Sequence, residues 1–305
     1  MQDVFTKYRK YLQVEKNASP YTVRNYTTDV VGFLNFLLRD GVVSLEEVDK
    51  HDLRDYLAFL MGRGFVKASI ARKLSAVRSF YRYLLREKIV ATSPIADTSS
   101  PRLNRRLPSF LTIDEMRRLL EAPDSATPRG QRDWALLELL YASGLRVSEL
   151  VRLNLEHINL ETREIRVWGK GAKERLALMG EPAARALNIY LTEGRRSLLS
   201  KKTTNALFVN RYGTRLTERS VQEMLGKYGQ MVGIGKKIHP HMLRHTFGTH
   251  LLDGGADLRV VQELLGHASL SSTQIYTHVS QSQKRKVYLS AHPLAKEGAG
   301  DLEHI

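Results

Sequence analysis

Residues 238–279, IHPHMLRHTFGTHLLDGGADLRVVQELLGHASLSSTQIYTHV, constrain the fold and chemistry of this 305-residue chain more than any other stretch. Pro240 fits the first turn of a helix. On that helix His241 and Arg244 share one face near the N-terminus, where free backbone N–H groups attract anions. The opposite face is apolar and is expected to pack into a core; it carries Leu243, Phe247 and Leu251.

Glycines divide the rest of this stretch. Gly254-Gly255 is expected to end the first helix, a second helix is expected over 257–265, and Gly266 is expected to end that one. His267 follows directly, and a third helix is expected to carry Tyr276. The stretch therefore combines a cluster of cationic groups with a phenol.

The whole chain is basic, with 47 Lys and Arg against 32 Asp and Glu, a net charge of +15. Such a surplus favours a polyanionic partner; a generally basic solvated surface is the alternative. Cysteine is absent, which excludes disulfides, thiolate nucleophiles and Cys-based zinc sites. No apolar run reaches the ~20 residues that span a bilayer, and the N-terminus has no signal-peptide core. We therefore expect a cytoplasmic protein without membrane insertion.

Residues 1–95 are expected to form an all-helical domain. Apolar residues recur at helical spacing over 4–12, 21–38 and 67–87, and Ser19-Pro20 is typical of a helix start. Ser44-Leu45-Glu46-Glu47 resembles a capping box before a further helix that would run to Met61. Four helices with short connections predict a compact bundle.

The last of these helices carries a basic stripe. Arg78, Arg82 and Arg86 follow an i, i+4, i+8 pattern and share one face, and Arg72 lies in the same basic region. Like charges at this spacing repel by roughly a few tenths of a kcal/mol per pair. A phosphate backbone would turn that repulsion into binding. The four arginines are therefore candidate DNA contacts, and a solvated helix face is the alternative.

Residues 96–110 are expected to be a basic linker, because they contain prolines, small polar residues and arginines without an apolar period. Such a linker would let two basic domains close around a duplex; an ordinary hinge is the alternative. The second domain is expected over 111–280, with a C-terminal helix and tail over 281–305. It opens with a capping box at Thr112-Ile113-Asp114-Glu115.

The second domain then changes from helical to strand periodicity. A strongly apolar helix stops at Gly144, and Arg146 follows the stop. Glu149, three residues on, is placed to hold the Arg146 guanidinium. Apolar residues alternate in three short runs between residues 157 and 178, which predicts three strands. Lys170 lies on a glycine-flanked turn before the third strand.

Five segments together resemble the motif set of the tyrosine recombinases, the phage-integrase-like family, and are most similar to its bacterial Xer type of chromosome-dimer resolvase. The segments are YASGLRVSEL, GKGAKER, HPHMLRHTFGTHLL, LGHASL and TQIYTHV. The resemblance covers nearly the whole chain. It implies a mainly α fold of two domains: an N-terminal four-helix, SAM-like core-binding domain and a helical catalytic domain with a small three-stranded antiparallel sheet.

The resemblance also implies a set of catalytic residues. They are Arg146, Lys170, His241, Arg244, His267 and Tyr276. Tyr276 would attack the scissile phosphate and form a 3′-phosphotyrosyl link, while Arg146 and Arg244 would grip the non-bridging oxygens. A free tyrosine has a pKa of ~10, so it needs a base or nearby cations. Two arginines and a histidine can stabilise the charge that builds on phosphorus without a metal.

The remaining residues of the set would handle protons. By the resemblance, Lys170 protonates the leaving 5′ oxygen, His241 assists proton transfer, and His267 donates to the phosphate. A phosphotyrosine keeps the energy of the broken bond, so rejoining needs no ATP and no cofactor is expected. A metal is not expected either, because the histidines of 239–250 match no usual zinc motif.

Other functions fit parts of the pattern. A type IB topoisomerase has nearly the same site and would relax supercoils as a monomer. A transposon or plasmid integrase would apply the same chemistry to other DNA. Residues 258–276 could also form a helix-turn-helix reader of a DNA-binding regulator, but that leaves Arg146 and Lys170 without a purpose.

The resemblance implies partners as well. A tetramer with itself or with a paralogous recombinase would hold two double-stranded DNA targets, exchange strands through a Holliday junction, and resolve chromosome dimers at a dif-like site during segregation. This places the protein on the nucleoid in the cytoplasm, with an FtsK-like DNA translocase as an activator. The basic helix expected over 281–292, which Pro293 would stop, would dock into a neighbouring subunit; a solvated terminal helix is the alternative.

Overall fold

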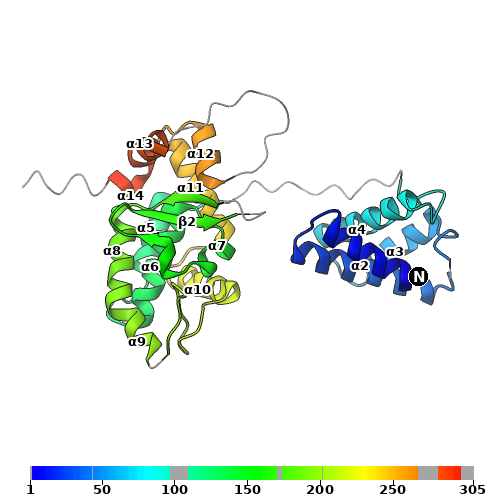
Figure 1. Ribbon diagram of the computed structural model, residues 1–305, viewed down its shortest axis with the longest axis horizontal. Helices are drawn as coiled ribbons and strands as arrows, with labels where there is room; N and C mark the ends of the chain where they lie inside the picture. The colour runs from blue at the N-terminus through cyan, green and yellow to red at the C-terminus, as the bar shows by residue number, and fades with distance from the viewer. Residues whose placement is uncertain are drawn as a thin grey trace, which may run out of the picture. The chain divides into compact units, whose positions relative to one another are not determined.

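The computed structural model describes residues 2–42, 44–96, 109–169, 174–200, 202–266 and 281–296. The chain forms two compact units, Met1–Arg106 and Leu107–Ile305. Both are mainly helical, and the second also holds a three-stranded antiparallel sheet (Figure 1). The expected fold class is therefore confirmed. Among the described helices, none is both long enough and apolar enough to cross a membrane.

The N-terminal unit contains a bundle of helices whose aromatic side chains form its core. The helices are α1 (Gln2–Val14), α2 (Pro20–Arg39), α3 (Lys50–Gly62) and α4 (Lys67–Arg86). Ser19 caps α2 as predicted, since its hydroxyl accepts the Thr22 amide at 3.1 Å. Phe33, Tyr56 and Phe80 are almost completely buried between the helices. The predicted apolar face of α4 lies in this core.

The predicted start of α3 was wrong. The capping box is formed by Asp49 and Asp52, and the helix begins at Lys50 rather than after Ser44. Asp49 accepts the Asp52 amide at 3.1 Å, while the Asp52 carboxylate accepts the Asp49 amide at 2.9 Å. Ser44 accepts the Glu46 amide, which makes only a local turn. Two candidate caps lie five residues apart in sequence, and the two reciprocal bonds of the aspartate pair select the second.

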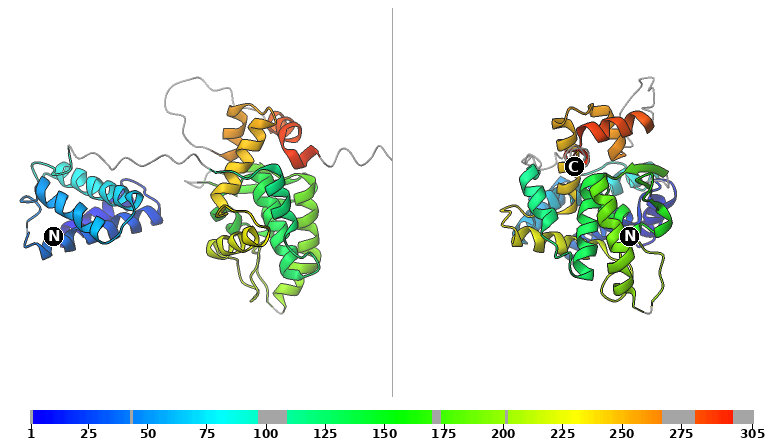
Figure 2. Two further views of the ribbon diagram at one scale, coloured as in Figure 1. Left: turned by 180° about the vertical axis from the view of Figure 1, so that it is seen from behind. Right: turned by 90° about the vertical axis from the view of Figure 1, so that its left-hand side faces the viewer.

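The second unit is built around α6 (Pro128–Ser143), a helix buried along nearly its whole length. Helix α8 runs alongside α6 (Figures 1 and 2). The capping box predicted at Thr112 and Glu115 is confirmed at the start of the helix before α6. The other helical segments of this part are α5 (Ile113–Glu121), α7 (Val147–Arg152), η1 (Leu155–His157), α8 (Glu181–Ile189), η2 (Tyr190–Gly194), α9 (Arg195–Leu199) and α10 (Glu218–Met231).

A small sheet connects α7 to α8 in the chain. It consists of β1 (Ile158–Asn159), β2 (Glu164–Trp168) and β3 (Glu174–Leu178), in the order β1-β2-β3 and antiparallel throughout. The three predicted strands are therefore confirmed. Ile165 faces the core opposite Ala177, and Val167 pairs with Arg175. The turn that carries Lys170 lies outside the described residues.

Four helices complete the second unit: α11 (Pro240–Asp253), α12 (Leu258–Leu265), α13 (Gln281–Ala291) and α14 (Pro293–Lys296). The predicted apolar face of α11 is buried, and Gly266 ends α12 in the left-handed conformation as expected. Helix α13 packs against α11 and α12 of the same chain (Figure 2). Pro293 follows the end of α13, as predicted, and also starts α14, because proline suits the first turn of a helix. Docking of α13 into a neighbouring subunit stays a prediction.

His292, between α13 and α14, is fully buried among aromatic rings. Its ring stacks on Tyr288 and also contacts Tyr141 and Phe247. Burial lowers the pKa of His292 from 6.5 to about 3. The unfolded chain takes up a proton below pH 6.5, and the folded chain does not until about pH 3. Acidification through that window therefore favours unfolding, by up to about 1.4 kcal/mol per pH unit.

We expect His292→Phe to flatten the pH dependence of unfolding between about pH 6.5 and pH 4. Urea unfolding can be followed by tryptophan fluorescence, because both tryptophans of the chain, Trp134 and Trp168, lie in the second unit. Part of the pH dependence should remain in this variant, because burial also lowers the pKa of His250. The matched control is His245→Gln, an exposed position. A wild-type slope in the His292 variant would contradict this assignment.

Candidate active site and DNA-contact residues

Arg146 is positioned by a sharp turn at the end of α6. Gly144 adopts φ +58°, and a Cβ there would lie 2.4 Å from Cδ1 of Phe247, so the turn requires glycine. Arg146 then caps α7. The Glu149 carboxylate accepts one hydrogen bond from Arg146 Nη1 at 2.8 Å and another from the Arg146 backbone amide at 2.9 Å. The predicted contact between the two residues is therefore confirmed. The Arg146 side chain stays 38% exposed, so it remains accessible to a ligand.

Arg244 approaches the same turn from α11. Its Nη1 donates to the Gly144 carbonyl and its Nη2 to the Leu265 carbonyl, both at 2.6 Å. The helical pattern placed Arg244 opposite the core face, yet the residue is only 8% exposed. The reason is that α12 and the α6 turn cover this side of α11, which periodicity within one helix does not reveal.

The electrostatic surroundings of Arg244 are positive. Burial, and then repulsion from Arg146, lowers the pKa of Arg244 to about 10, although Glu149 opposes this shift. The guanidinium therefore stays charged at neutral pH. Arg146 Nη2 donates to the Gly266 carbonyl at 3.4 Å, so both arginines reach the C-terminal end of α12. The structure thus brings Arg146 and Arg244 together at the point in the chain directly before His267.

The other predicted site residues are less completely described. His241 is exposed on the first turn of α11, after His239, whose Nδ1 accepts the Met242 amide at 3.2 Å. Lys170, His267 and Tyr276 lie outside the described residues. No group of three or more potential metal ligands occurs in the part of the chain that the structure describes.

His250 is a packing residue within the second unit. Its Nδ1 lies 2.8 Å from the Tyr141 hydroxyl and its Nε2 lies 2.9 Å from the Leu111 carbonyl. The carbonyl can only accept, so Nε2 donates and Nδ1 accepts from the tyrosine. Thr246, on the same helix, accepts the Leu111 amide at 3.0 Å. These bonds attach α11 to the start of the second unit.

The sequence interpretation missed Arg175, which joins this cluster from β3. Its Nη2 donates to Glu149 at 2.9 Å, so one carboxylate binds two arginines. The Arg175 side chain is 16% exposed, and burial lowers its pKa. Arg175 is the last residue of the segment GKGAKER, from which only Lys170 was predicted as a site residue. Strand alternation could not show that its side chain would reach α7 and α12.

We expect Glu149→Gln to destabilise the second unit by about 3 kcal/mol, near the lower end for breaking a buried ion pair, because Arg146 is partly solvated. Glu149 is only 5% exposed at its side chain, and its loss leaves the charges of Arg146 and Arg175 uncompensated. Thermal unfolding measures the effect. Glu156→Gln, at a side chain 57% exposed, is the control and is expected to change stability by less than about 0.5 kcal/mol. Equal effects of the two variants would refute the role of Glu149.

The four arginines predicted to contact DNA differ in their surroundings. Asp29, which is buried, binds both Arg72 and Lys73 and so leaves a surplus positive charge on α4. Arg86 instead binds the two carboxylates of Glu15 and Glu87. Arg82 is exposed and has no paired carboxylate among the described residues, whereas Arg78 is half-buried and has a partner.

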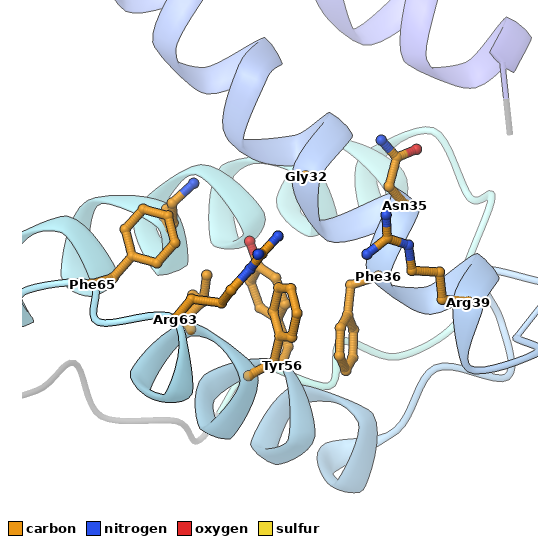
Figure 3. A pocket seen from close by; sticks show the side chains of 10 residues that line it. Gly32, Asn35, Phe36, Arg39, Tyr56, Arg63 and Phe65 are labelled. Atoms are coloured by element: carbon orange, nitrogen blue, oxygen red, sulfur yellow. The ribbon is translucent and has the colours of Figure 1, made fainter.

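A basic pocket of about 410 Å³ lies on the N-terminal unit (Figure 3). Its aromatic wall is formed by Phe36 of α2 and Tyr56 of α3, together with Phe59 and Phe65. The lining cations are Arg39, Arg63 and Lys73. Arg63 lies 5.4 Å from the centre of the Phe59 ring and Lys73 lies 5.0 Å from that of Phe65. Arg39 was not singled out in the sequence, because it stands alone at the end of its helix.

Comparison with known proteins matches both units. The model of the phage integrase family matches residues 109–283, and that of the phage integrase N-terminal SAM-like domain matches residues 5–88. Tyrosine recombinase XerC of Pelotomaculum thermopropionicum is 48% identical over 295 residues, which covers 94% of this chain and 96% of the relative. Tyrosine recombinase XerD of Staphylococcus epidermidis is 40% identical and covers 97% of this chain and 100% of the relative.

A solved structure gives the same result. The crystal structure of XerH site-specific recombinase bound to difH substrate, a pre-cleavage complex, has a TM-score of 0.67, an identity of 25%, and covers 92% of this chain and 83% of that chain. The chain belongs to the phage integrase family and is a tyrosine recombinase of the Xer type. It is therefore a site-specific DNA recombinase, an enzyme, as its motifs predicted, and not a non-catalytic regulator.

Proposed function

We propose that this recombinase cuts and rejoins DNA through a 3′-phosphotyrosyl intermediate on Tyr276 and a Holliday junction, and that it resolves chromosome dimers at a dif-like site. The observation that carries the proposal is the convergence of Arg146 and Arg244 at the end of α12. Two fixed guanidinium groups can bind the two non-bridging oxygens of one phosphate. The full-length similarity to relatives named XerC and XerD supports the cellular role.

The catalytic steps follow from the charges. Tyr276 attacks phosphorus, and Arg146 and Arg244 stabilise the additional negative charge of the pentacoordinate transition state. Lys170 donates a proton to the leaving 5′ oxygen. His241 assists proton transfer, and His267 donates to the phosphate. Because the phosphodiester energy is kept in the tyrosyl link, the reverse attack by a 5′ hydroxyl rejoins the strands without ATP.

The proposed assembly is a tetramer on two DNA duplexes, with a second copy or a paralogue as partner. Relatives of this chain carry both the XerC and the XerD name, which supports pairing between two related recombinases. In such an assembly α13 would leave α11 and α12 of its own chain and dock on a neighbour. Activation by an FtsK-like translocase and a location on the nucleoid in the cytoplasm belong to the same proposal.

The N-terminal unit would bind the DNA backbone through α4 and the basic pocket. The cations proposed for this contact are Arg72, Arg78, Arg82, Arg39, Arg63 and Lys73. Arg86 is assigned to the fold instead, because two carboxylates already neutralise it. This assignment separates residues on one helix face that the sequence pattern could not distinguish.

We expect Arg82→Ala to reduce the salt dependence of DNA binding, with the slope of log K against log[salt] falling in magnitude by about 0.9, the value for one phosphate contact. Arg86→Ala is the matched control, since it removes the same group one helical turn away and should leave the slope unchanged. Filter binding or fluorescence anisotropy at several salt concentrations measures both. An unchanged slope for the Arg82 variant would mean that this residue contacts no phosphate.

The test of function uses a supercoiled plasmid that carries two copies of the DNA captured by the protein. We expect deletion or inversion between the two copies, and no reaction on a plasmid without them. If this recombinase alone gives no recombination, a paralogous recombinase is added to the reaction. Relaxation of either plasmid without recombination would instead identify a topoisomerase. Absence of both reactions, with the paralogue present, would contradict the proposed function.

A further inference from the structure

Three arginines hold the carbonyls of the last two residues of α12 and of Gly266, which ends the helix. Arg175 Nη1 donates to Leu264 at 3.3 Å, Arg244 Nη2 to Leu265 at 2.6 Å, and Arg146 Nη2 to Gly266 at 3.4 Å. Carbonyls at the end of a helix have no partner within the helix and are usually satisfied by water or by local turns. Here cationic side chains from three other elements satisfy them, and two of the three are proposed phosphate ligands.

Arg175 differs from the other two because it also fixes one of them. Its Nη2 donates to Oε2 of Glu149 at 2.9 Å, the same oxygen that accepts the backbone amide of Arg146. The other oxygen of Glu149 holds the Arg146 guanidinium. Arg175 is therefore connected through one carboxylate to both the backbone and the side chain of Arg146. It lies on β3, directly after the segment that contains Lys170.

The fit between Arg175 and Gly266 is close. Gly266 adopts φ +67°, and a Cβ at this position would lie 2.6 Å from Nε and 2.8 Å from Cδ of Arg175. A side chain at position 266 would therefore be strained by its own backbone and would displace Arg175. By contrast, a Cβ at Gly248 would make ordinary contacts at 3.4 Å or more, so that glycine is not required for space.

We propose that Arg175 is a positioning residue for strand cleavage: it fixes the end of α12, and with it the backbone that leads into His267, and it orients Arg146 through Glu149. This inference rests on the proposed function of Arg146 and His267. Arg175 acts through these groups and not on the phosphate. Lysine cannot replace it, because one ammonium lacks the planar fork that binds Glu149 and the Leu264 carbonyl together.

The test measures single-turnover cleavage of a nicked target duplex whose cleaved fragment diffuses away. We expect Arg175→Ala to slow cleavage by about 10- to 100-fold, with a DNA dissociation constant close to that of the wild type. The rates are measured well below the melting temperature of the variant, because losing the contacts with Glu149 and the Leu264 carbonyl also lowers stability. Arg175→Lys should restore only a small part of the rate. Arg166→Ala removes an arginine of the neighbouring strand that donates to the Glu156 carbonyl, and it should cleave like the wild type.

A double-mutant cycle separates positioning from a general structural role. Arg175→Ala should slow the His267→Ala variant less than it slows the wild type, because the part of its effect that acts through His267 is already lost and only the part that acts through Arg146 remains. Multiplied effects, or a loss in DNA affinity that accounts for the slower rate, would overturn the proposal. If Arg175→Ala does not fold, Gly266→Ala takes its place, since it displaces Arg175 and should show the same non-additivity with His267→Ala.

The two levels of proposal fail differently. If the wild type forms no covalent complex with DNA, the proposed function fails. If the wild type forms the complex and Arg175→Ala cleaves at the same rate, the function stands and the positioning role of Arg175 is refuted.

Discussion

Tyr276→Phe is expected to abolish covalent attachment to DNA while leaving DNA affinity within about threefold of the wild type, since phosphate contacts by cations dominate affinity. The substitution removes one oxygen, and that oxygen is the proposed nucleophile. A denaturing gel of protein mixed with fragmented DNA in EDTA measures attachment, and a native gel measures affinity.

The controls for this experiment are two other tyrosines of the second unit. Tyr228 and Tyr190 are buried, and their pKa values are raised by burial, so neither is suited to act as a nucleophile. Their phenylalanine variants should still form the covalent complex wherever they fold. A complex that persists in Tyr276→Phe would remove Tyr276 from the role. Loss of DNA binding in that variant would also count against it.

Arg244→Ala is expected to slow cleavage by about 10²- to 10³-fold, the range for losing one preorganised donor to a developing oxyanion. The effect has a second source, because the Gly144 and Leu265 carbonyls lose their donors. Each buried carbonyl left without a partner destabilises the fold by about 1–3 kcal/mol. Single-turnover rates must therefore be measured well below the melting temperature of the variant.

A second buried arginine provides the matched control. Arg195 is as buried as Arg244 and donates to the carbonyls of Thr204, Ala206 and Leu207, away from the proposed site. Arg195→Ala should lower stability by a similar amount and leave the cleavage rate of folded protein unchanged. Equal rate losses in the two variants would mean that Arg244 supports only the fold.

Sequence periodicity predicted most of the fold because its signals are local. Pro20 and Pro240 each stand at the first turn of a helix, and Gly144 and Gly266 each end one. Alternation alone predicted the three strands. Ser44 was chosen wrongly as a helix cap, because two caps compete within a few residues and only the reciprocal bonds of the second distinguish them.

What the sequence could not predict depends on contacts between distant elements. Arg244 was expected on the outer face of α11 and is covered by α12 and by the α6 turn. Arg175 was passed over, because its contacts with Glu149 and Leu264 join β3 to α7 and α12. Arg86 looked equivalent to Arg82 along one helix face, although Glu87 and Glu15, the residue that follows α1, neutralise it. The surroundings of these three arginines could be predicted only by knowing which elements pack together.

The central claim is that Tyr276 carries the DNA, and the most direct measurement is the mass of the modified peptide. Trypsin releases residues 260–284 as one peptide, in which Tyr276 is the single tyrosine. After covalent capture and nuclease digestion, we predict that this peptide carries a nucleotide on the Tyr276 phenol, joined through its 3′ phosphate. A nucleotide on another residue, a 5′-phosphate linkage, or captured DNA with this peptide unmodified would contradict the claim.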